Sequence, residues 1–188
     1  MKLLSSALLA AGLFTAAVSS QAATSHFEGS IADQADVIWG TFTVTDYASY
    51  DSVNLLFTDS YGEGNFDPIL FLWDSYGTLI EANDDGGPYW DAMIVRSGDT
   101  ALAAGDYYFS ITHFPNWNKG SNLTNGFNYD GQTRGAPSLG ADWSLYVTGV
   151  SEASILPGAP VVPEPETYAM LLAGLGLVGV VARRRRQR

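Results

Sequence analysis

Oxygen-bearing side chains gather in the turns of one stretch of the chain, residues 65–91. Five of them lie between apolar runs: Asp67, Asn83, Asp84, Asp85 and Asp91. Ca²⁺ takes roughly six to eight oxygen ligands in flexible geometry, so loops that fold toward one another could hold it. Asp and Asn also bond their own backbone in tight turns, and no D-x-D-x-D-G loop of the EF-hand type is present. Calcium ligation and turn capping are therefore both open for these residues.

The five tryptophans divide into two groups. Trp39, Trp73 and Trp143 lie in apolar runs, where large aromatic side chains usually belong to a core. Trp90 and Trp117 lie in loops and are the better candidates for a flat surface on which a sugar could stack. Packing beneath the loops is the alternative for both.

Groups that announce a reaction are missing from the sequence. His26 and His113 form no H-E-x-x-H zinc motif, and there is no G-x-S-x-G elbow and no phosphate-binding glycine loop. The chain has no cysteine, which excludes a thiol nucleophile and a thiolate metal site. We expect no enzyme, no catalytic residue and no cofactor other than calcium. A hydrolase that uses a carboxylate pair stays an alternative, because spacing alone does not reveal such a pair.

The central segment is strongly acidic. Residues 24–162 hold three basic and 18 acidic side chains, a net charge of −15. Such a charge repels nucleic acid and anionic polysaccharide and suits a domain that binds hard cations. We therefore expect no nucleic-acid partner.

Apolar and aromatic runs of five to eight residues, separated by Gly, Asp, Asn and Ser, predict an all-β fold. The expected strands are 26–31, 37–45, 52–58, 69–73, 78–82, 92–96, 106–113 and 142–149. Eight short strands of this kind predict a two-sheet β-sandwich of jelly-roll type.

Three boundaries follow from composition. The domain is expected over residues 23–150, with an aperiodic Gly- and Asn-rich loop at 114–141. Long structureless loops are often functional, although a surface loop without a role is the alternative. Residues 151–162 contain two prolines and are expected to form an extended linker.

Both ends of the chain look like export signals. Residues 1–22 have a basic start, an apolar run and small residues before the expected cleavage point, which indicates a signal peptide for the Sec translocon and signal peptidase. Residues 167–182 are expected to form a single transmembrane helix, short for a full span. The arginines that follow should stay cytoplasmic: Arg183, Arg184, Arg185 and Arg186.

The last 26 residues, 163–188, combine Pro163-Glu164-Pro165, the apolar run and the arginine block. This order closely resembles the PEP-CTERM sorting signal of Gram-negative bacteria. The resemblance implies recognition of Pro163, Glu164 and Pro165 by an exosortase, a transient membrane stage at the inner membrane, and delivery to the envelope surface or extracellular matrix. The family is associated with exopolysaccharide and biofilm production.

A second resemblance covers roughly residues 34–150. The pattern F-D-P-x-L-x-L-x-D-x-x-G-x-L-x-x-x-N-D-D-G-G at residues 66–87 is similar to the bacterial pre-peptidase C-terminal (PPC) domain. It implies a jelly-roll accessory module without catalysis, and some relatives bind calcium. We therefore expect an exosortase-sorted surface protein with a structural or adhesive role. A calcium- or glycan-binding accessory module is the alternative.

Overall fold

The computed structural model describes residues 23–45, 53–61 and 65–162, together with Gly174, Leu175, Val178 and Arg183. The expected signal peptide, the Pro163–Pro165 motif and most of the expected transmembrane helix with its arginine block lie outside the described residues.

The described part of the chain folds into two antiparallel sheets, in agreement with the expected all-β sandwich. The strands are β1 (Ala23–Ser30), β2 (Val37–Val44), β3 (Val53–Thr58), β4 (Pro68–Asp74), β5 (Leu79–Asn83), β6 (Met93–Ser97), β7 (Gly105–His113), β8 (Asp142–Val150) and β9 (Glu152–Leu156). One sheet has the order β1-β8-β3-β6, and the other has the order β5-β4-β7-β2-β9. All eight expected strands are present, with ends shifted by three residues at most.

The pairing of the first eight strands is that of a jelly roll. β1 pairs with β8, β2 with β7, β3 with β6 and β4 with β5, and these pairs alternate between the two sheets. A long antiparallel ribbon of strand pairs that wraps around a core gives this order. Its innermost turn is the β4–β5 hairpin, where the Gly77 N–H donates to the Asp74 carbonyl 2.9 Å away.

Two apolar clusters explain the composition of the strands. The larger cluster fills the space between the sheets and includes Leu70, Leu72 and Phe109. The smaller cluster lies on the outer face of the five-stranded sheet and includes Ile69 and Phe71. β4 therefore buries both of its faces, which is why it reads as a continuous apolar run rather than an alternating one.

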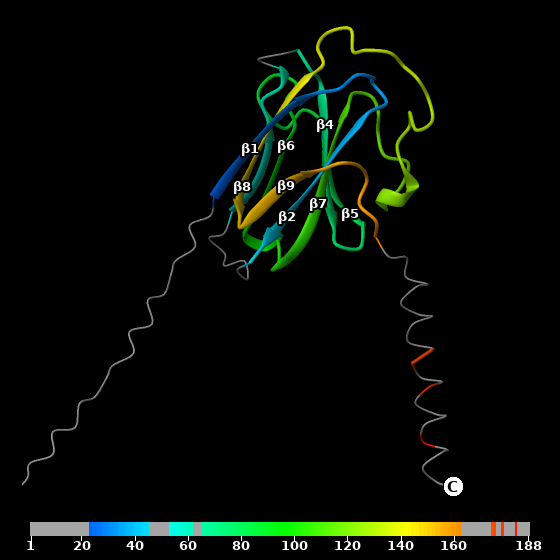
Figure 1. Ribbon diagram of the computed structural model, residues 1–188. Helices are drawn as coiled ribbons and strands as arrows, with labels where there is room; N and C mark the ends of the chain where they lie inside the picture. The colour runs from blue at the N-terminus through cyan, green and yellow to red at the C-terminus, as the bar shows by residue number, and fades with distance from the viewer. Residues whose placement is uncertain are drawn as a thin grey trace, which may run out of the picture.

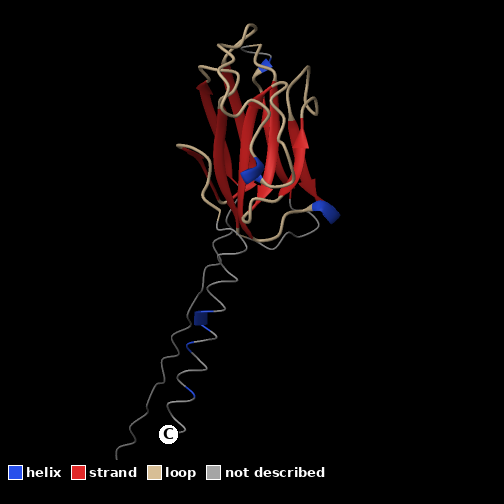
Figure 2. Ribbon diagram, turned by 90° about the vertical axis from the view of Figure 1, so that its right-hand side faces the viewer, coloured by secondary structure: helices blue, strands red, loops and turns tan. Residues whose placement is uncertain are grey.

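The long loop 114–141 covers that outer face (Figures 1 and 2). It carries a short 3₁₀ helix, η2 (Leu123–Asn125), and contributes Leu123 and Phe127 to the smaller cluster, which also holds Trp39 and Trp73 of the sheet. Phe127 packs edge-on against Trp39 and Trp73, with ring centroids 5.8 and 6.4 Å apart. The loop is thus a structural cover for the second cluster, and its length reflects the area that it hides.

The sandwich extends further along the chain than the sequence indicates. Residues 151–162 were expected to be a linker, but β9 pairs with β2 over five positions, from Thr43↔Glu152 to Trp39↔Leu156. Val162 then packs against the smaller cluster, beside Gly77 and Leu123. The folded part therefore reaches the residue before Pro163, because β9 and Val162 cover apolar surface at the edge of the five-stranded sheet.

Candidate functional site

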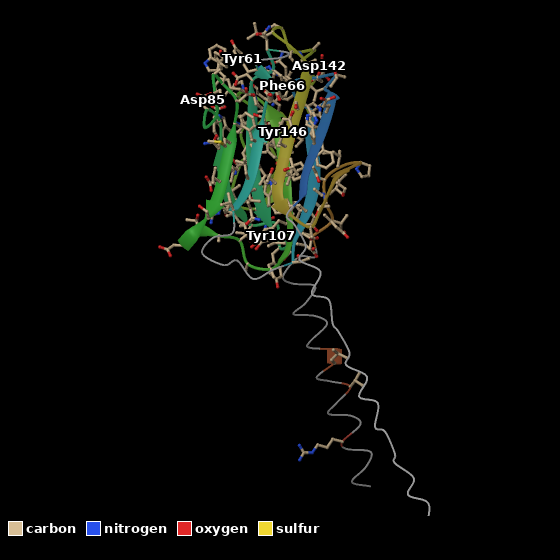
Figure 3. The ribbon with its side chains drawn as sticks, turned by 90° about the vertical axis from the view of Figure 1, so that its left-hand side faces the viewer. Tyr61, Phe66, Asp85, Tyr107, Asp142 and Tyr146 are labelled. Carbon is tan, nitrogen blue, oxygen red and sulfur yellow. The ribbon has the colours of Figure 1, made fainter. Side chains whose placement is uncertain are left out.

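The β4–β5 hairpin brings three of the expected calcium ligands together. Asp67 immediately precedes β4, and Asp84 and Asp85 immediately follow β5. The two strands are antiparallel with Leu70 opposite Asn83, so the residues that flank them meet at the open end of the hairpin. Carboxylate oxygens of the three aspartates lie within 4.8 Å of one another. Figure 3 shows Asp85 at the end of the sandwich opposite to Tyr107.

The electrostatics of this group, which we call the acidic triad, are unfavourable without a counter-charge. The Oδ1 atoms of Asp67 and Asp84 are buried and accept no hydrogen bond from any described residue. Burial, reinforced by the charges of Asp84, Asp85 and Asp91, raises the pKa of Asp67 to about 6. Burial and the charge of Asp85 likewise raise the pKa of Asp84 to about 6. A cation between these oxygens would relieve both the desolvation and the repulsion.

The other two expected ligands do a different task. The Asn83 Oδ1 atom accepts hydrogen bonds from the backbone N–H groups of Gly86 and Met93, at 2.8 and 2.9 Å. The buried Asp91 Oδ1 atom accepts from the N–H groups of Ser60 and Tyr61, at 2.7 and 3.0 Å. Both side chains therefore fix loops, which is the turn-capping role left open by the sequence, and Asp91 acts on the triad only through its charge.

The two loop tryptophans lie in different surroundings. Trp117 is half-buried in the smaller apolar cluster, edge-on to Phe71 at 6.1 Å, and so belongs to the packing under the long loop. Trp90 is 47% exposed, and its ring centroid lies 4.7 Å from that of Tyr61. The Tyr61 ring also neighbours the exposed Tyr89. Sequence spacing did not single out these two tyrosines, because Tyr61 comes from a separate loop.

The two histidines lie in different packing environments. His113 packs edge-on against Phe66, and burial lowers its pKa, so the ring stays neutral. His26 stacks on Tyr146 with ring centroids 4.1 Å apart on the outer face of the four-stranded sheet, and its Nε2 atom lies 2.9 Å from the Ser144 hydroxyl.

Comparison with known proteins bears on the tail of the chain. No curated protein matches the sequence. Within the described residues, no helix has both the length and the apolar character that a membrane crossing needs. The PEP-CTERM protein-sorting motif matches residues 161–186, in agreement with the expectation from Pro163-Glu164-Pro165 and the arginine block. The chain therefore carries a PEP-CTERM sorting motif, which indicates an exported protein that an exosortase processes and sorts to the cell envelope.

Proposed function

We propose that the sandwich is a calcium-binding, non-enzymatic surface module with a structural or adhesive role in the exopolysaccharide matrix of a Gram-negative bacterium. The sorting motif supports delivery to the envelope. The acidic triad supports the calcium assignment, and it is the observation on which this proposal rests.

The donor set of the triad fits a hard cation. Asp67, Asp84 and Asp85 supply carboxylate oxygens only, and Ca²⁺ prefers oxygen ligands. The two buried Oδ1 atoms without a donor are acceptors that a cation would satisfy. Loops hold all three residues, and loop ligands suit the flexible geometry of Ca²⁺ better than the strict octahedron of Mg²⁺.

Calcium at this position would act on the shape of the loops. The triad joins the start of β4 to the loop that follows β5, and that loop continues to Trp90 and Asp91. A bound ion would therefore fix the tip of the sandwich in one conformation. Such an ion would make a surface module rigid outside the cell without any disulfide, and the chain has no cysteine to form one.

Direct titration with Ca²⁺ tests the site. Isothermal calorimetry should detect one Ca²⁺ per wild-type molecule, and the Asp84→Ala, Asp85→Ala double variant should lose that binding. Asp99→Ala is the matched control, because Asp99 is exposed and lies outside the triad. Undiminished binding in the double variant would exclude the triad as the calcium site.

The envelope role needs a test in cells. The intact mass of the protein from the surface and the medium should end near residues 162–166 only in a strain that has the exosortase. Retention in the matrix should then fall when a chelator removes Ca²⁺, or when the triad is replaced. Retention that is indifferent to both treatments would contradict a calcium-dependent adhesive role.

A glycan-binding module is the second candidate, and the exposed Trp90 favours it. Trp90 and Tyr61 form a surface pair at the same end of the sandwich as the triad. Trp117 is half-buried beneath the long loop, so its replacement by alanine should disturb packing first. Trp90→Ala is therefore the cleaner test, and unchanged retention on exopolysaccharide would argue against sugar contact there.

A further inference from the structure

A polar hollow opens where the four-stranded sheet meets the loop after β3. Its volume is about 300 Å³, which is the lower end of the size range of small-molecule sites. Seven residues line it: Glu28, Gly29, Asp59, Ser60, Asp142, Trp143 and Ser144. They come from β1, β8 and the segment after β3, and Figure 3 shows Asp142 at the same end of the molecule as Tyr61.

Charge is the first property that selects a ligand for this hollow. Three of its residues are carboxylates, Glu28, Asp59 and Asp142, and no lysine or arginine lines it. His26 lies at the rim, with its Nε2 atom 3.4 Å from Glu28. A ligand with a positive charge is therefore complementary to the hollow, and an anionic ligand is excluded.

A single metal ion does not fit this hollow as well as an organic cation does. Across the described ranges, the acidic triad is the only group of three that brings its ligand atoms within 4.8 Å of one another. The carboxylates of the hollow are therefore spread too widely to coordinate one ion together. They suit a larger cation that can reach them at separate points.

The indole of Trp143 is the second property that selects a ligand. This side chain is only 7% exposed, and its Nε1 atom lies at the edge of the ring that faces Gly29. In the described residues Nε1–H donates to no acceptor, whereas the Trp73 indole donates to Ser110 at 3.0 Å. Because Nε1 is not one of the buried atoms left without a partner, it is open to solvent at the wall of the hollow, where an acceptor oxygen of a ligand can take the place of water.

Fixed hydroxyl groups add to the polar wall. The Ser60 hydroxyl donates to the Ser144 carbonyl and accepts from the Ser144 N–H, at 3.1 and 2.9 Å. The Asp91 Oδ1 atom accepts a hydrogen bond from the Ser60 N–H at 2.7 Å, so the segment that carries Ser60 is fixed before any ligand binds. Rigid polar groups around a hollow reduce the entropy lost on binding.

From these properties we infer that the hollow binds an amino sugar, a ring that carries a protonated amine beside neutral hydroxyl groups. The ammonium group meets the carboxylates, and a hydroxyl or ring oxygen accepts from the Trp143 Nε1–H. A simple polyamine meets the first requirement and fails the second, because it has no oxygen. A neutral sugar meets the second and leaves the carboxylates without a counter-charge.

Residue Tyr61 extends the site beyond one ring. It follows Ser60 directly in the chain, and the same Asp91 oxygen accepts from its N–H. Its ring lies 4.7 Å from Trp90. A chain of amino sugars that leaves the hollow past Ser60 therefore meets aromatic surface, which is suited to the apolar faces of further sugar rings.

Calorimetry on the purified mature protein, near neutral pH and physiological salt, tests the inference. The probes are a glucosamine dimer and hexamer, their N-acetylated counterparts, cellobiose, spermidine and trilysine. All titrations are done with excess chelator, so that the result does not depend on the acidic triad or on calcium. We expect the glucosamine dimer to bind at least about tenfold more tightly than every other dimer or cation.

Variants locate the binding. Asp59→Asn and Asp142→Asn should each weaken the glucosamine dimer about tenfold or more, while Asp99→Asn, which makes the same change of charge elsewhere, leaves it unaltered. Trp90→Ala should reduce only the extra affinity of the hexamer. Equal binding of cellobiose would overturn the role of the ammonium group, and equal binding of spermidine or trilysine would overturn the sugar. An unchanged affinity in the Asp59→Asn, Asp142→Asn double variant would overturn the site itself.

Discussion

Replacing Asp84 by asparagine should reverse the order of stability between variant and wild type when calcium is added. The pKa of Asp84 is raised to about 6, well above its ordinary value of 3.8. A raised pKa means that the folded state favours the protonated form more than the unfolded state does. The carboxylate therefore lowers the stability of the metal-free protein fully above pH 6, and this cost disappears as the pH falls toward 4.

The size of the effect follows from the shift. One pKa unit corresponds to about 1.4 kcal/mol, but solvent screens a side chain that remains partly exposed, so we expect about 1 kcal/mol for Asp84. Asparagine is neutral at every pH and should raise the metal-free melting temperature at pH 7.5 by roughly 2–4 °C. At pH 4.5 the gain should fall to about a third of that, because wild-type Asp84 is then largely protonated in the folded state but still mostly ionised in the unfolded state.

Calcium should reverse which of the two proteins, wild type or Asp84→Asn, is more stable. At a Ca²⁺ concentration of about 100 times Kd, binding adds about 2.7 kcal/mol to the wild-type protein, or roughly 8 °C. The asparagine variant lacks one of three carboxylate ligands and should lose most of that gain. The variant is then the more stable protein with chelator and the less stable one with Ca²⁺.

Differential scanning calorimetry at the two pH values, each with chelator and with Ca²⁺, measures the melting temperature under all four conditions. Asp99→Asn is the control and should not differ from wild type in any of them. A variant that melts below wild type in chelator would refute the reasoning, since it would show that the Asp84 carboxylate stabilises the metal-free fold. A variant that keeps the full calcium response would remove Asp84 from the site.

Three further predictions concern the scaffold. Asp91→Ala removes the acceptor of buried backbone donors and should lower the free energy of unfolding by about 3 kcal/mol in a urea titration, with Asp91→Asn recovering part of the loss. Phe127→Ala should cost about 3–5 kcal/mol and should open the loop 114–141 to limited proteolysis, whereas cleavage as slow as in wild type would contradict its covering role. A chain that ends after Ser151 should melt far below one that ends after Val162, because only the longer one keeps β9 on β2; equal melting temperatures would show that β9 adds nothing to the fold.

The strands were predictable because period-two alternation and strong turn signals act locally. β4 was found from its apolar run alone, and the structure supplies the reason in its two buried faces. β9 was missed because it is short, carries a glutamate and a serine on its exposed positions, and lies next to prolines and glycine. Its pairing is set by the exposed edge of β2, which local patterns do not reveal.

The candidate sites show the same division between local and distant information. Asp67, Asp84 and Asp85 flank one hairpin, so a sequence that predicts the hairpin also predicts their meeting. The sequence could not show that Asn83 and Asp91 differ from these three residues, because Asn and Asp side chains both cap turns and bind cations. Only the direction in which each side chain points in the folded protein decides between the two roles. The hollow was out of reach, since its carboxylates meet only through the register of β1 and β3 on β8.

The packing of Val162 also determines the orientation of the sandwich relative to anything that its C-terminus is joined to. Val162 lies against Gly77 in the β4–β5 turn, whereas the acidic triad lies at the other end of the same hairpin. The described chain therefore reaches Val162 at the end of the hairpin opposite to the acidic triad, so a protein held by its C-terminus would present the triad on the side away from the attachment.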